Sequence, residues 1–491
     1  VYRPLKALPE LPSAEPETRC LLEAAHLAAR GQGRAAQRSA ERCVADDGAR
    51  RDALEEVPAL VARRLEHRAS LALLDAMLLQ AFYQWVLDFS FDYRVHPFLS
   101  LGPRNRRRLP AKHQAALLRS LGDGDDAEAL SRELLRRVPA DPDYALAREA
   151  LARYVRIMDS KRHEPLRATS RLEKGAEGDA VGALQRRLAS EGYYDGAASG
   201  RFDDATHAAV VRYQETHQLA AGGVVGAQTV ESLNIPFEWR VKQLLVALGR
   251  FRESPLSRVG RPELYVDVNL PAFELEVVEG GETTHRFKVI VGSNRRVSDP
   301  MNDGVVWHQR RTKIFDTKIS EVVLNPSWIV PAGIVVDEIE PKVLENPDYL
   351  AENNFKKVGS LLVQGPGETN PLGVVKFTLE STDSIYLHDT DKRWLFKEHV
   401  RDLSHGCIRV DRPLELAKLI LGRQGVDEDR IDGRVKEGTT LPIKVSSPIR
   451  ISIEYRTVGA TAEGELAFYG DVYGYDVAYW KKRTPITRRF P

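Results

Sequence analysis

The spacing of apolar residues changes along this chain of 491 residues, and the change constrains the fold more than any other feature. Between residues 14 and 165, apolar side chains recur three and four positions apart in a background rich in Ala, Leu, Arg and Glu, which predicts amphipathic helices. From Glu263 onward, short β-branched runs stand between glycine turns, which is typical of strands. A chain of this length also exceeds a single hydrophobic core. The sequence therefore predicts an α+β multidomain protein.

The same changes of pattern suggest where the domains begin and end. Residues 172–233 contain glycine turns between short helical patterns, and residues 329–365 interrupt the β-rich half with a helix and loops, as a lid over a site would. The predicted boundaries are 1–165 for an α-helical scaffold, completed by helix 236–251; 168–234 for a small three-helix domain; 262–455 for a β-rich domain; 329–365 for a capping insertion within it; and 456–491 for a C-terminal tail that packs on the body.

The overall charge and the apolar runs argue against two broad classes of protein. Lys and Arg total 71 against 70 acidic residues, so the charge gives no reason to expect a nucleic acid partner. The apolar run 71–89 is interrupted by Asp75, Gln80, Gln84 and Asp88. No segment therefore matches the roughly 20 apolar residues that a membrane-spanning helix needs.

Cys407 is the only cysteine in the second half of the chain, and its surroundings suggest a nucleophilic thiol. Cys20 and Cys43 could pair as a disulfide in an oxidising compartment, which would leave Cys407 as the reactive thiol. A nucleophilic thiol needs a base or a cation beside it, and His388 stands nineteen residues earlier. His388 ends an alternating run that predicts a strand, and a strand end holds its side chain firmly.

The turn before the cysteine, Ser404-His405-Gly406, suits a catalytic loop. Its glycine lets the backbone approach a reacting carbonyl group. The amides of Gly406 and Cys407 could then face a developing oxyanion.

Two other interpretations of Cys407 remain open. A cysteine of this kind is often a small buried hydrophobe. Zinc is the second alternative, because His388, His399, His405 and Cys407 are potential ligands. The spacing disfavours zinc, since it contains no C-x₂-C pair and His405 and Cys407 are only two positions apart.

The histidine, separated by fifteen residues from Ser-His-Gly-Cys-apolar-Arg, resembles the signature of the L,D-transpeptidase catalytic domain of the YkuD family. The match fixes six positions together: His388, Ser404, His405, Gly406, Cys407 and Arg409. Segments 322–331 and 365–377 resemble the larger members of the family, which carry an insertion over the active site. Residues 172–233 resemble the small helical peptidoglycan-binding domain, although a module that only packs against its neighbours would show the same pattern.

The resemblance implies acyl transfer to Cys407. The thiolate would attack the L,D peptide bond before the terminal D-alanine of a peptidoglycan tetrapeptide, release D-alanine and leave a thioester. The amine of a second stem would then resolve the thioester into a 3-3 crosslink. His388 would be the general base and later the acid, and as an imidazolium partner it would lower the pKa of the thiol. No metal or organic cofactor is implied.

Several further residues receive roles from the same resemblance. His405 and Ser404 would shape the loop, and Gly406 and Cys407 would supply the oxyanion hole. Arg409 would bind either a substrate carboxylate or a structural aspartate. Three residues are predicted to line the substrate pocket: Tyr386, Trp328 and Asn325. Plain core packing of the two aromatic residues is an equal alternative.

Other activities remain open because the motif does not name the acceptor. Water could resolve the same thioester, which would make the protein an L,D-carboxypeptidase or an enzyme that cuts a crosslink or a tethered protein. A non-catalytic wall-binding scaffold is a further alternative, whereas a general cysteine protease lacks its usual motif.

The resemblance also implies a cellular location and binding partners for the protein. The expected partners are peptidoglycan donor and acceptor stems and other cell-wall synthesis proteins, with inhibition by carbapenem-type β-lactams. The expected location is the periplasm, with an N-terminal anchor upstream of the present sequence.

Overall fold

The computed structural model describes residues 139, 141–159, 165–167, 171–256, 262–294, 296–299, 304–307, 310–380 and 385–483. The Cys20–Cys43 pair and most of the expected scaffold, residues 1–138, lie outside the described residues. Within the described ranges, no helix is long and apolar enough to cross a membrane.

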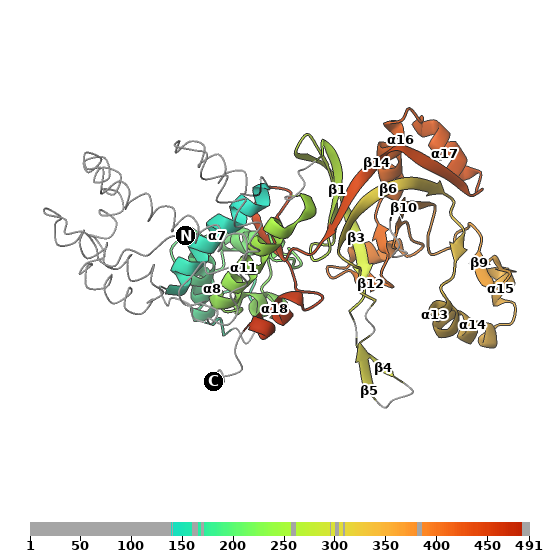
Figure 1. Cartoon of the computed structure of the whole chain (residues 1–491). Helices are drawn as coiled ribbons and strands as arrows, with labels where there is room; N and C mark the ends of the chain where they lie inside the picture. The colour runs from blue at the N-terminus through green and yellow to red at the C-terminus, as the bar shows by residue number, and fades with distance from the viewer. Residues whose placement is uncertain are drawn as a thin grey trace, which may run out of the picture. The chain divides into compact units, whose positions relative to one another are not determined.

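Two helices that are distant in sequence pack together at the start of the described chain. Helix α7 (Pro142–Asp159) lies against α11 (Phe237–Glu253), as Figure 1 shows. Their contact includes edge-to-face ring pairs, with centroids 6.3 Å apart for Tyr144 and Phe251 and 6.0 Å apart for Tyr154 and Phe237. The chain between the two helices therefore leaves this helix pair and returns to it.

That intervening chain forms a small three-helix module with a core of its own. Its helices are α8 (Asp179–Ser190), α9 (Asp204–Thr216) and α10 (Ala227–Leu233). Asp203 starts α9, because its carboxylate accepts hydrogen bonds from the amide and the hydroxyl of Thr206 at 2.8 and 2.7 Å. The apolar residues spaced along the helices are fully buried, among them Leu184, Leu188, Val210, Tyr213 and Leu233.

The second half of the described chain is built on a nine-stranded sheet in the order β12-β3-β13-β11-β10-β6-β14-β1-β2, which an additional β2–β3 pairing closes into a ring. The strands are β1 (Leu264–Asn269), β2 (Glu274–Glu279), β3 (Glu282–Gly292), β6 (Phe315–Leu324), β10 (Val375–Leu379), β11 (Leu387–His388), β12 (Asp402–Ser404), β13 (Ile408–Val410) and β14 (Leu441–Glu454). A hairpin of β4 (Arg296–Asp299) and β5 (Gly304–Trp307) follows β3.

Two helices cover one face of this sheet, α16 (Pro413–Gly422) and α17 (Glu428–Lys436). The buried side of α16, including Leu416, Ile420 and Leu421, packs into the main apolar core together with alternate residues of the strands. Proline in the first turn of α16 suits a helix start, because its missing amide hydrogen would have no partner there.

A cap is inserted between β6 and β10. Strands β7 (Trp328–Ile329), β9 (Leu361–Gln364) and β8 (Phe355–Val358) form a small sheet. The helical part comprises α13 (Ala332–Ile334), the π-helical turn η3 (Val335–Ile339), α14 (Glu340–Glu345) and α15 (Tyr349–Glu352). Four buried side chains form a separate core for the cap: Val330, Ile339, Phe355 and Leu362.

The C-terminal segment joins the helix pair to the sheet. It contains a hairpin of β15 (Val458–Ala460) and β16 (Leu466–Phe468), followed by helix α18 (Tyr475–Arg483). The ring of Phe468 lies edge-on to Tyr154 of α7, with centroids 5.4 Å apart, and Asp476 pairs with Arg250 of α11 at 2.5 Å. The described architecture confirms the α+β fold class, with a helical region, a small helical module and a β-rich domain that carries a cap.

Candidate functional site

The register of three neighbouring strands gathers the predicted site residues on one face of the sheet. Strand β10 places Lys376 opposite His388 of β11, and β11 places His388 opposite Arg409 of β13. Because successive side chains of a strand point to opposite faces, Tyr386 and Cys407 share the face of His388 and Arg409. The residues between them, Leu387 and Ile408, are fully buried in the core on the other face.

The thiol of Cys407 lies against Tyr386. The backbone and the hydroxyl of Tyr386 both hydrogen-bond with Cys407, and the same hydroxyl bonds with the side chain of Trp328 at the start of the cap. Burial raises the pKa of the Cys407 thiol, although the hydrogen bonds from Tyr386 and the charges of Lys376 and Arg409 oppose the shift. Tyr386 therefore lies beside the candidate nucleophile and Trp328 beside Tyr386, and their role in lining a substrate pocket stays a prediction.

His388 is buried and electrically neutral. Burial lowers the pKa of its imidazole to about 3, and the positive charges of Arg409 and Lys376 add to the shift, while the backbone of Asp389 and Pro371 opposes it. The ring lies 5.5 Å from that of Tyr386, between centroids. Within the described residues, its buried Nδ1 has no hydrogen-bond partner of normal geometry.

These pKa directions correct one expectation. The sequence suggested an imidazolium at His388 that lowers the pKa of the thiol, whereas the structure raises the pKa of Cys407 and lowers that of His388. Burial causes both shifts, whereas the charges of Lys376 and Arg409 add to the shift of His388 and oppose that of Cys407. These directions favour a protonated thiol at Cys407 and a neutral imidazole at His388.

The loop before Cys407 is held by its own serine. Ser404 Oγ donates to the carbonyl of Cys407 at 2.6 Å and accepts from the amide of Gly406 at 3.1 Å. Gly406 has φ of 123°, a conformation that favours glycine. The Gly406 amide is thus engaged by Ser404 in this structure, which differs from its expected orientation toward an oxyanion.

The side chain of His405 extends from the loop toward the cap. About one third of its side chain is exposed, and its Nε2 donates to Glu338 Oε1 of η3 at 2.6 Å. Arg310 adds ion pairs with Asp337 at 3.4 Å and Glu338 at 3.7 Å. The hydrogen bond from His405 lowers the pKa of Glu338. His405 therefore connects the loop to the cap.

Arg409 stands next to the nucleophile. Burial lowers the pKa of its guanidinium, and the negative charges that oppose this shift are those of Asp391, Cys407 and Glu338. Its Nε is buried and, within the described residues, has no hydrogen-bond partner. Both of its predicted roles, toward an aspartate and toward a substrate carboxylate, remain compatible with this position.

The side chain of Asn325, which the sequence suggested as a pocket residue, is engaged by backbone carbonyl groups. Its side-chain nitrogen donates to the carbonyls of Arg434, Val435 and Thr439 at 2.9, 3.2 and 3.3 Å. It is buried at the end of β6 with φ of 47°. Asn325 therefore fastens the end of α17 and the start of β14 to β6, and the geometry gives no support to a contact with substrate.

Two site residues escaped sequence reasoning. Lys376 lies on the active face, with Nζ 4.4 Å from the centre of the Tyr386 ring, and its alternation with buried Val375 and Phe377 could have placed it there. Thr312 donates to the carbonyl of Gly406 at 2.8 Å, and no sequence pattern marks it.

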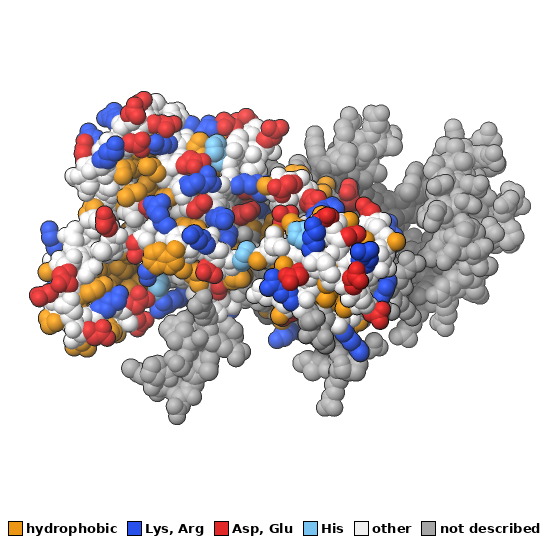
Figure 2. Space-filling model, turned by 180° about the vertical axis from the view of Figure 1, so that it is seen from behind, with side chains coloured by type: hydrophobic (Ala, Val, Ile, Leu, Met, Phe, Trp, Pro, Cys, Tyr) orange, Lys and Arg blue, Asp and Glu red, His pale blue; other side chains and the backbone are white. Residues whose placement is uncertain are grey.

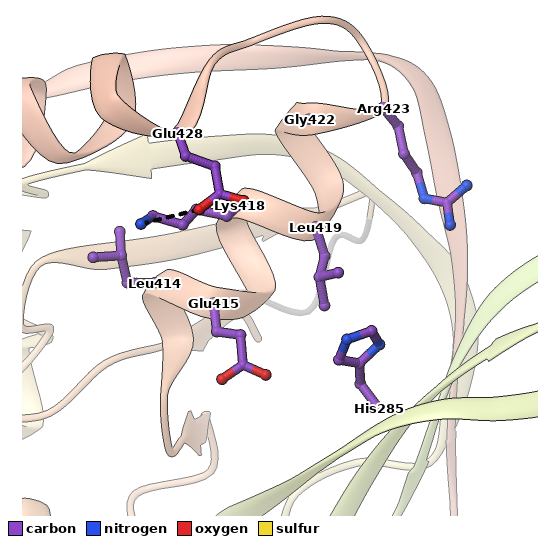
Figure 3. A pocket seen from close by; sticks show the side chains of 8 residues that line it. All are labelled: His285, Leu414, Glu415, Lys418, Leu419, Gly422, Arg423 and Glu428. Atoms are coloured by element: carbon purple, nitrogen blue, oxygen red, sulfur yellow. Dashed lines mark ion pairs between the residues drawn. The ribbon is translucent and has the colours of Figure 1, made fainter.

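A cavity of about 700 Å³ lies away from these residues, between α16 and His285 of β3 (Figure 3). Its cations are already paired: Lys418 bonds Asp432 at 2.9 Å and Glu428 at 3.4 Å, and Arg423 bonds Glu279. Within the part of the chain that is described, no three His, Cys, Asp or Glu side chains gather as metal ligands would. On the face shown in Figure 2, acidic and basic side chains are interspersed. The sheet face with Cys407 is therefore the candidate site.

Two family models match the chain. Residues 263–449 match the YkuD family, the L,D-transpeptidase catalytic domain, and residues 177–233 match the family described as "Putative peptidoglycan binding domain". Both matches confirm the resemblances inferred from the motifs.

Individual proteins resemble parts of the chain. A Haemophilus influenzae protein named "Putative L,D-transpeptidase" is 30% identical over 232 residues, which are 43% of this chain and 44% of that protein. The amidase CwlM of Mycobacterium tuberculosis is 45% identical over 56 residues, 11% of this chain and 14% of the amidase. The chain thus spans less than half the length of these relatives. The solved L,D-transpeptidase of Xylanimonas cellulosilytica covers 59% of this chain and all of its own, at 17% identity and a TM-score of 0.21.

Proposed function

We propose that this chain, which carries the catalytic domain of the YkuD family of L,D-transpeptidases and a peptidoglycan-binding domain, forms 3-3 crosslinks in peptidoglycan through a thioester on Cys407. The observation that carries the proposal is the shared sheet face of Tyr386, His388, Cys407 and Arg409 beside the cap. A thiol, a neutral base and a cation on one sheet face support the proposal, because acyl transfer by cysteine needs groups of these kinds.

The first half-reaction forms the thioester. Cys407 Sγ attacks the carbonyl carbon before the terminal D-alanine of a tetrapeptide stem, and the thiol proton passes to His388. A neutral imidazole is the form that can accept this proton, so the lowered pKa of His388 keeps the base available at neutral pH. The C–N bond then breaks, and the imidazolium returns the proton to the amine of departing D-alanine.

The second half-reaction transfers the acyl group. The side-chain amine of a second stem attacks the thioester carbon, the new C–N bond forms and the C–S bond breaks. His388 takes the proton from the attacking amine, and the thiol is restored. Exclusion of water favours the amine over hydrolysis, and the cap, joined to the catalytic loop through Glu338 and His405, is positioned to provide it.

The small helical module would bind peptidoglycan and so keep the enzyme close to its substrate. We place the enzyme outside the cytoplasmic membrane, in the periplasm, because its substrate lies there. Carbapenem-type β-lactams, which offer a strained carbonyl to the same thiol, are the expected inhibitors.

Intact mass measurement tests the proposal. The native protein and a Cys407→Ala variant are incubated with a disaccharide-tetrapeptide, and the soluble products are separated and identified by mass. A stem lacking D-alanine is expected on the native protein only, with 3-3 dimers released. Tripeptide without dimer would transfer the assignment to an L,D-carboxypeptidase. If no adduct forms but the protein still binds isolated sacculi, the assignment becomes a non-catalytic wall-binding scaffold.

A further inference from the structure

Thr312 lies beneath the catalytic loop and has both of its hydrogen-bonding capacities in use. It is fully buried in the segment that precedes β6. Its Oγ1 donates to the carbonyl of Gly406 at 2.8 Å and accepts from the amide of Gly292 at 2.8 Å. The hydroxyl has a single proton, so the accepted bond from Gly292 directs that proton toward Gly406.

Tyr473, which comes from the C-terminal segment, holds Thr312 in place. Its hydroxyl donates to the carbonyl of Gly292 at 2.8 Å and accepts from the amide of Thr312 at 3.1 Å. Tyr473 is itself buried, and its amide donates to the hydroxyl of Tyr455 at 2.9 Å. The four bonds among Gly292, Thr312, Tyr473 and Gly406 therefore form one closed polar network in the core, where an unpaired group would be costly.

The carbonyl of Gly406 belongs to the peptide unit that carries the amide of Cys407. Because a peptide unit is planar and trans, its C=O and N–H point in opposite directions. A hydrogen bond that fixes the Gly406 oxygen on one side of the loop therefore fixes the direction of the Cys407 N–H on the other side. Ser404 fixes the next carbonyl, that of Cys407, at 2.6 Å. The peptide units before and after Cys407 are thus each held at the carbonyl oxygen.

We propose that Thr312 is a positioning residue for acyl transfer, which aims the Cys407 amide at the oxyanion of the tetrahedral intermediate and is itself held by Tyr473. The inference rests on the proposed function only in that Cys407 accepts an acyl group. It concerns the charge on the carbonyl oxygen and not the formation of the thiolate. Reactions of Cys407 with and without an oxyanion should therefore respond differently to loss of the Thr312 hydroxyl.

Two reagents separate these reactions on the same sulfur. With p-nitrophenyl acetate, the sulfur–carbon bond forms through a tetrahedral oxyanion, and the carbon–oxygen bond then breaks to release p-nitrophenolate. With iodoacetamide, sulfur displaces iodide in one step that forms no oxyanion. Both rates are measured on the full chain from the mass of the peptide that contains Cys407.

Thr312→Val keeps the shape of the side chain but removes the hydroxyl. Deleting one oxyanion donor costs about 10²- to 10³-fold, so misdirecting one is expected to slow acetylation roughly 10- to 100-fold. Alkylation should stay within about twofold of the native rate, and Thr312→Ser should restore acetylation. Tyr473→Phe should lower acetylation in the same direction, because Thr312 loses its anchor.

Other outcomes would overturn the inference. If acetylation and alkylation both keep their native rates in Thr312→Val, the hydroxyl has no positioning role. If both rates fall by the same factor, the variant displaces the sulfur and the inference also fails. Failure of Thr312→Ser to restore the ratio would also count against the hydroxyl. Because p-nitrophenyl acetate does not resemble a peptide stem, a native protein that acetylates but ignores tetrapeptide would reject the proposed function and leave this inference standing.

Discussion

His405, in the loop before Cys407, donates a hydrogen bond of 2.6 Å to Glu338 of the cap. The nucleophile's own loop is thereby joined to the subdomain beside it, two residues away from Cys407. Arg310 reinforces the same acidic turn through Asp337 and Glu338. This contact should therefore govern how firmly the cap is attached and how accessible the thiol is.

Glu338→Gln is expected to loosen the cap. The hydrogen bond from His405 lowers the pKa of Glu338, so the carboxylate contributes to attachment above its ordinary pKa, and this contribution is lost as pH falls through the lowered value. Hydrogen exchange of residues 335–345 should be faster in the variant at pH 7, and less different from the native protein as pH falls toward 3. Glu345→Gln, at an exposed position of α14, is the matched control. Equal exchange in native protein and Glu338→Gln would contradict the role of this contact.

Asn325→Ala should destabilise the fold and leave substrate affinity unchanged. The change removes the side-chain donor shared by three part-buried carbonyl groups, one of which, that of Val435, keeps its bond from the amide of Gly438. A lost hydrogen bond typically costs about 0.5–1.5 kcal/mol. Denaturant unfolding should therefore give a clearly lower free energy of unfolding, whereas Asn346→Ala, at an exposed position of the cap, should have little effect. Full stability together with a raised KM would instead restore the role in substrate binding that the sequence suggested.

The alkylation of Cys407 should increase with pH well beyond neutrality. A thiol with a raised pKa remains protonated at pH 7, and a neutral imidazole on the same sheet face adds no positive charge, so the iodoacetamide rate should follow one ionisation above the usual value of about 8.5. Peptide mass spectrometry separates Cys407 from the other two cysteines. A reactive plateau reaching down to pH 6 would reveal a thiolate–imidazolium pair and reject the neutral resting state.

Tyr386→Phe should shift that profile to higher pH. The tyrosine hydroxyl stabilises the thiolate, and a hydrogen bond to a charged group contributes about 1.5–3 kcal/mol, which corresponds to roughly one to two pKa units. The shift is measured from the same alkylation series. Tyr349→Phe, in the cap core, serves as the control, and an unmoved profile in Tyr386→Phe would show that the hydroxyl does not support the thiolate.

Gly292→Ala should disrupt the network beneath the loop. A methyl group at Gly292 would overlap the carbonyl oxygen of Arg310 and crowd the amide of Thr312, both of which are backbone atoms. Overpacking of this kind typically costs about 1–3 kcal/mol, so thermal unfolding should occur at a lower temperature. Gly333→Ala, where nothing lies within 4 Å of the new carbon, is the control. A fully stable Gly292→Ala would mean that the segment at Thr312 can move away freely.

The sequence predicted the parts of this protein that depend on local pattern. Alternation of apolar and polar residues predicted the strand that ends at His388, and a compact motif identified Ser404, Gly406 and Cys407 together. The neutral state of His388 could not be predicted, because it depends on burial and on two cations that other strands supply. Lys376 reaches His388 through strand register, which residue spacing does not encode.

Thr312 and Asn325 show the same limit in two ways. Thr312 lies 94 residues before Gly406, in a stretch without periodicity, so nothing local marks its bond to the loop. Asn325 stands in a segment that resembles the family, yet its amide is engaged by carbonyls more than a hundred residues later. Roles of both kinds depend on tertiary hydrogen bonds.

The cap enters and leaves the sheet domain at a single point, because Trp328 of β7 pairs with Gln364 of β9, and its apolar core is separate from that of the sheet. An insertion with adjacent ends and an independent interior can be lengthened, shortened or exchanged without changing the register of β6 or β10. The insertion can therefore vary while the strands that carry His388 and Arg409 keep their pairing.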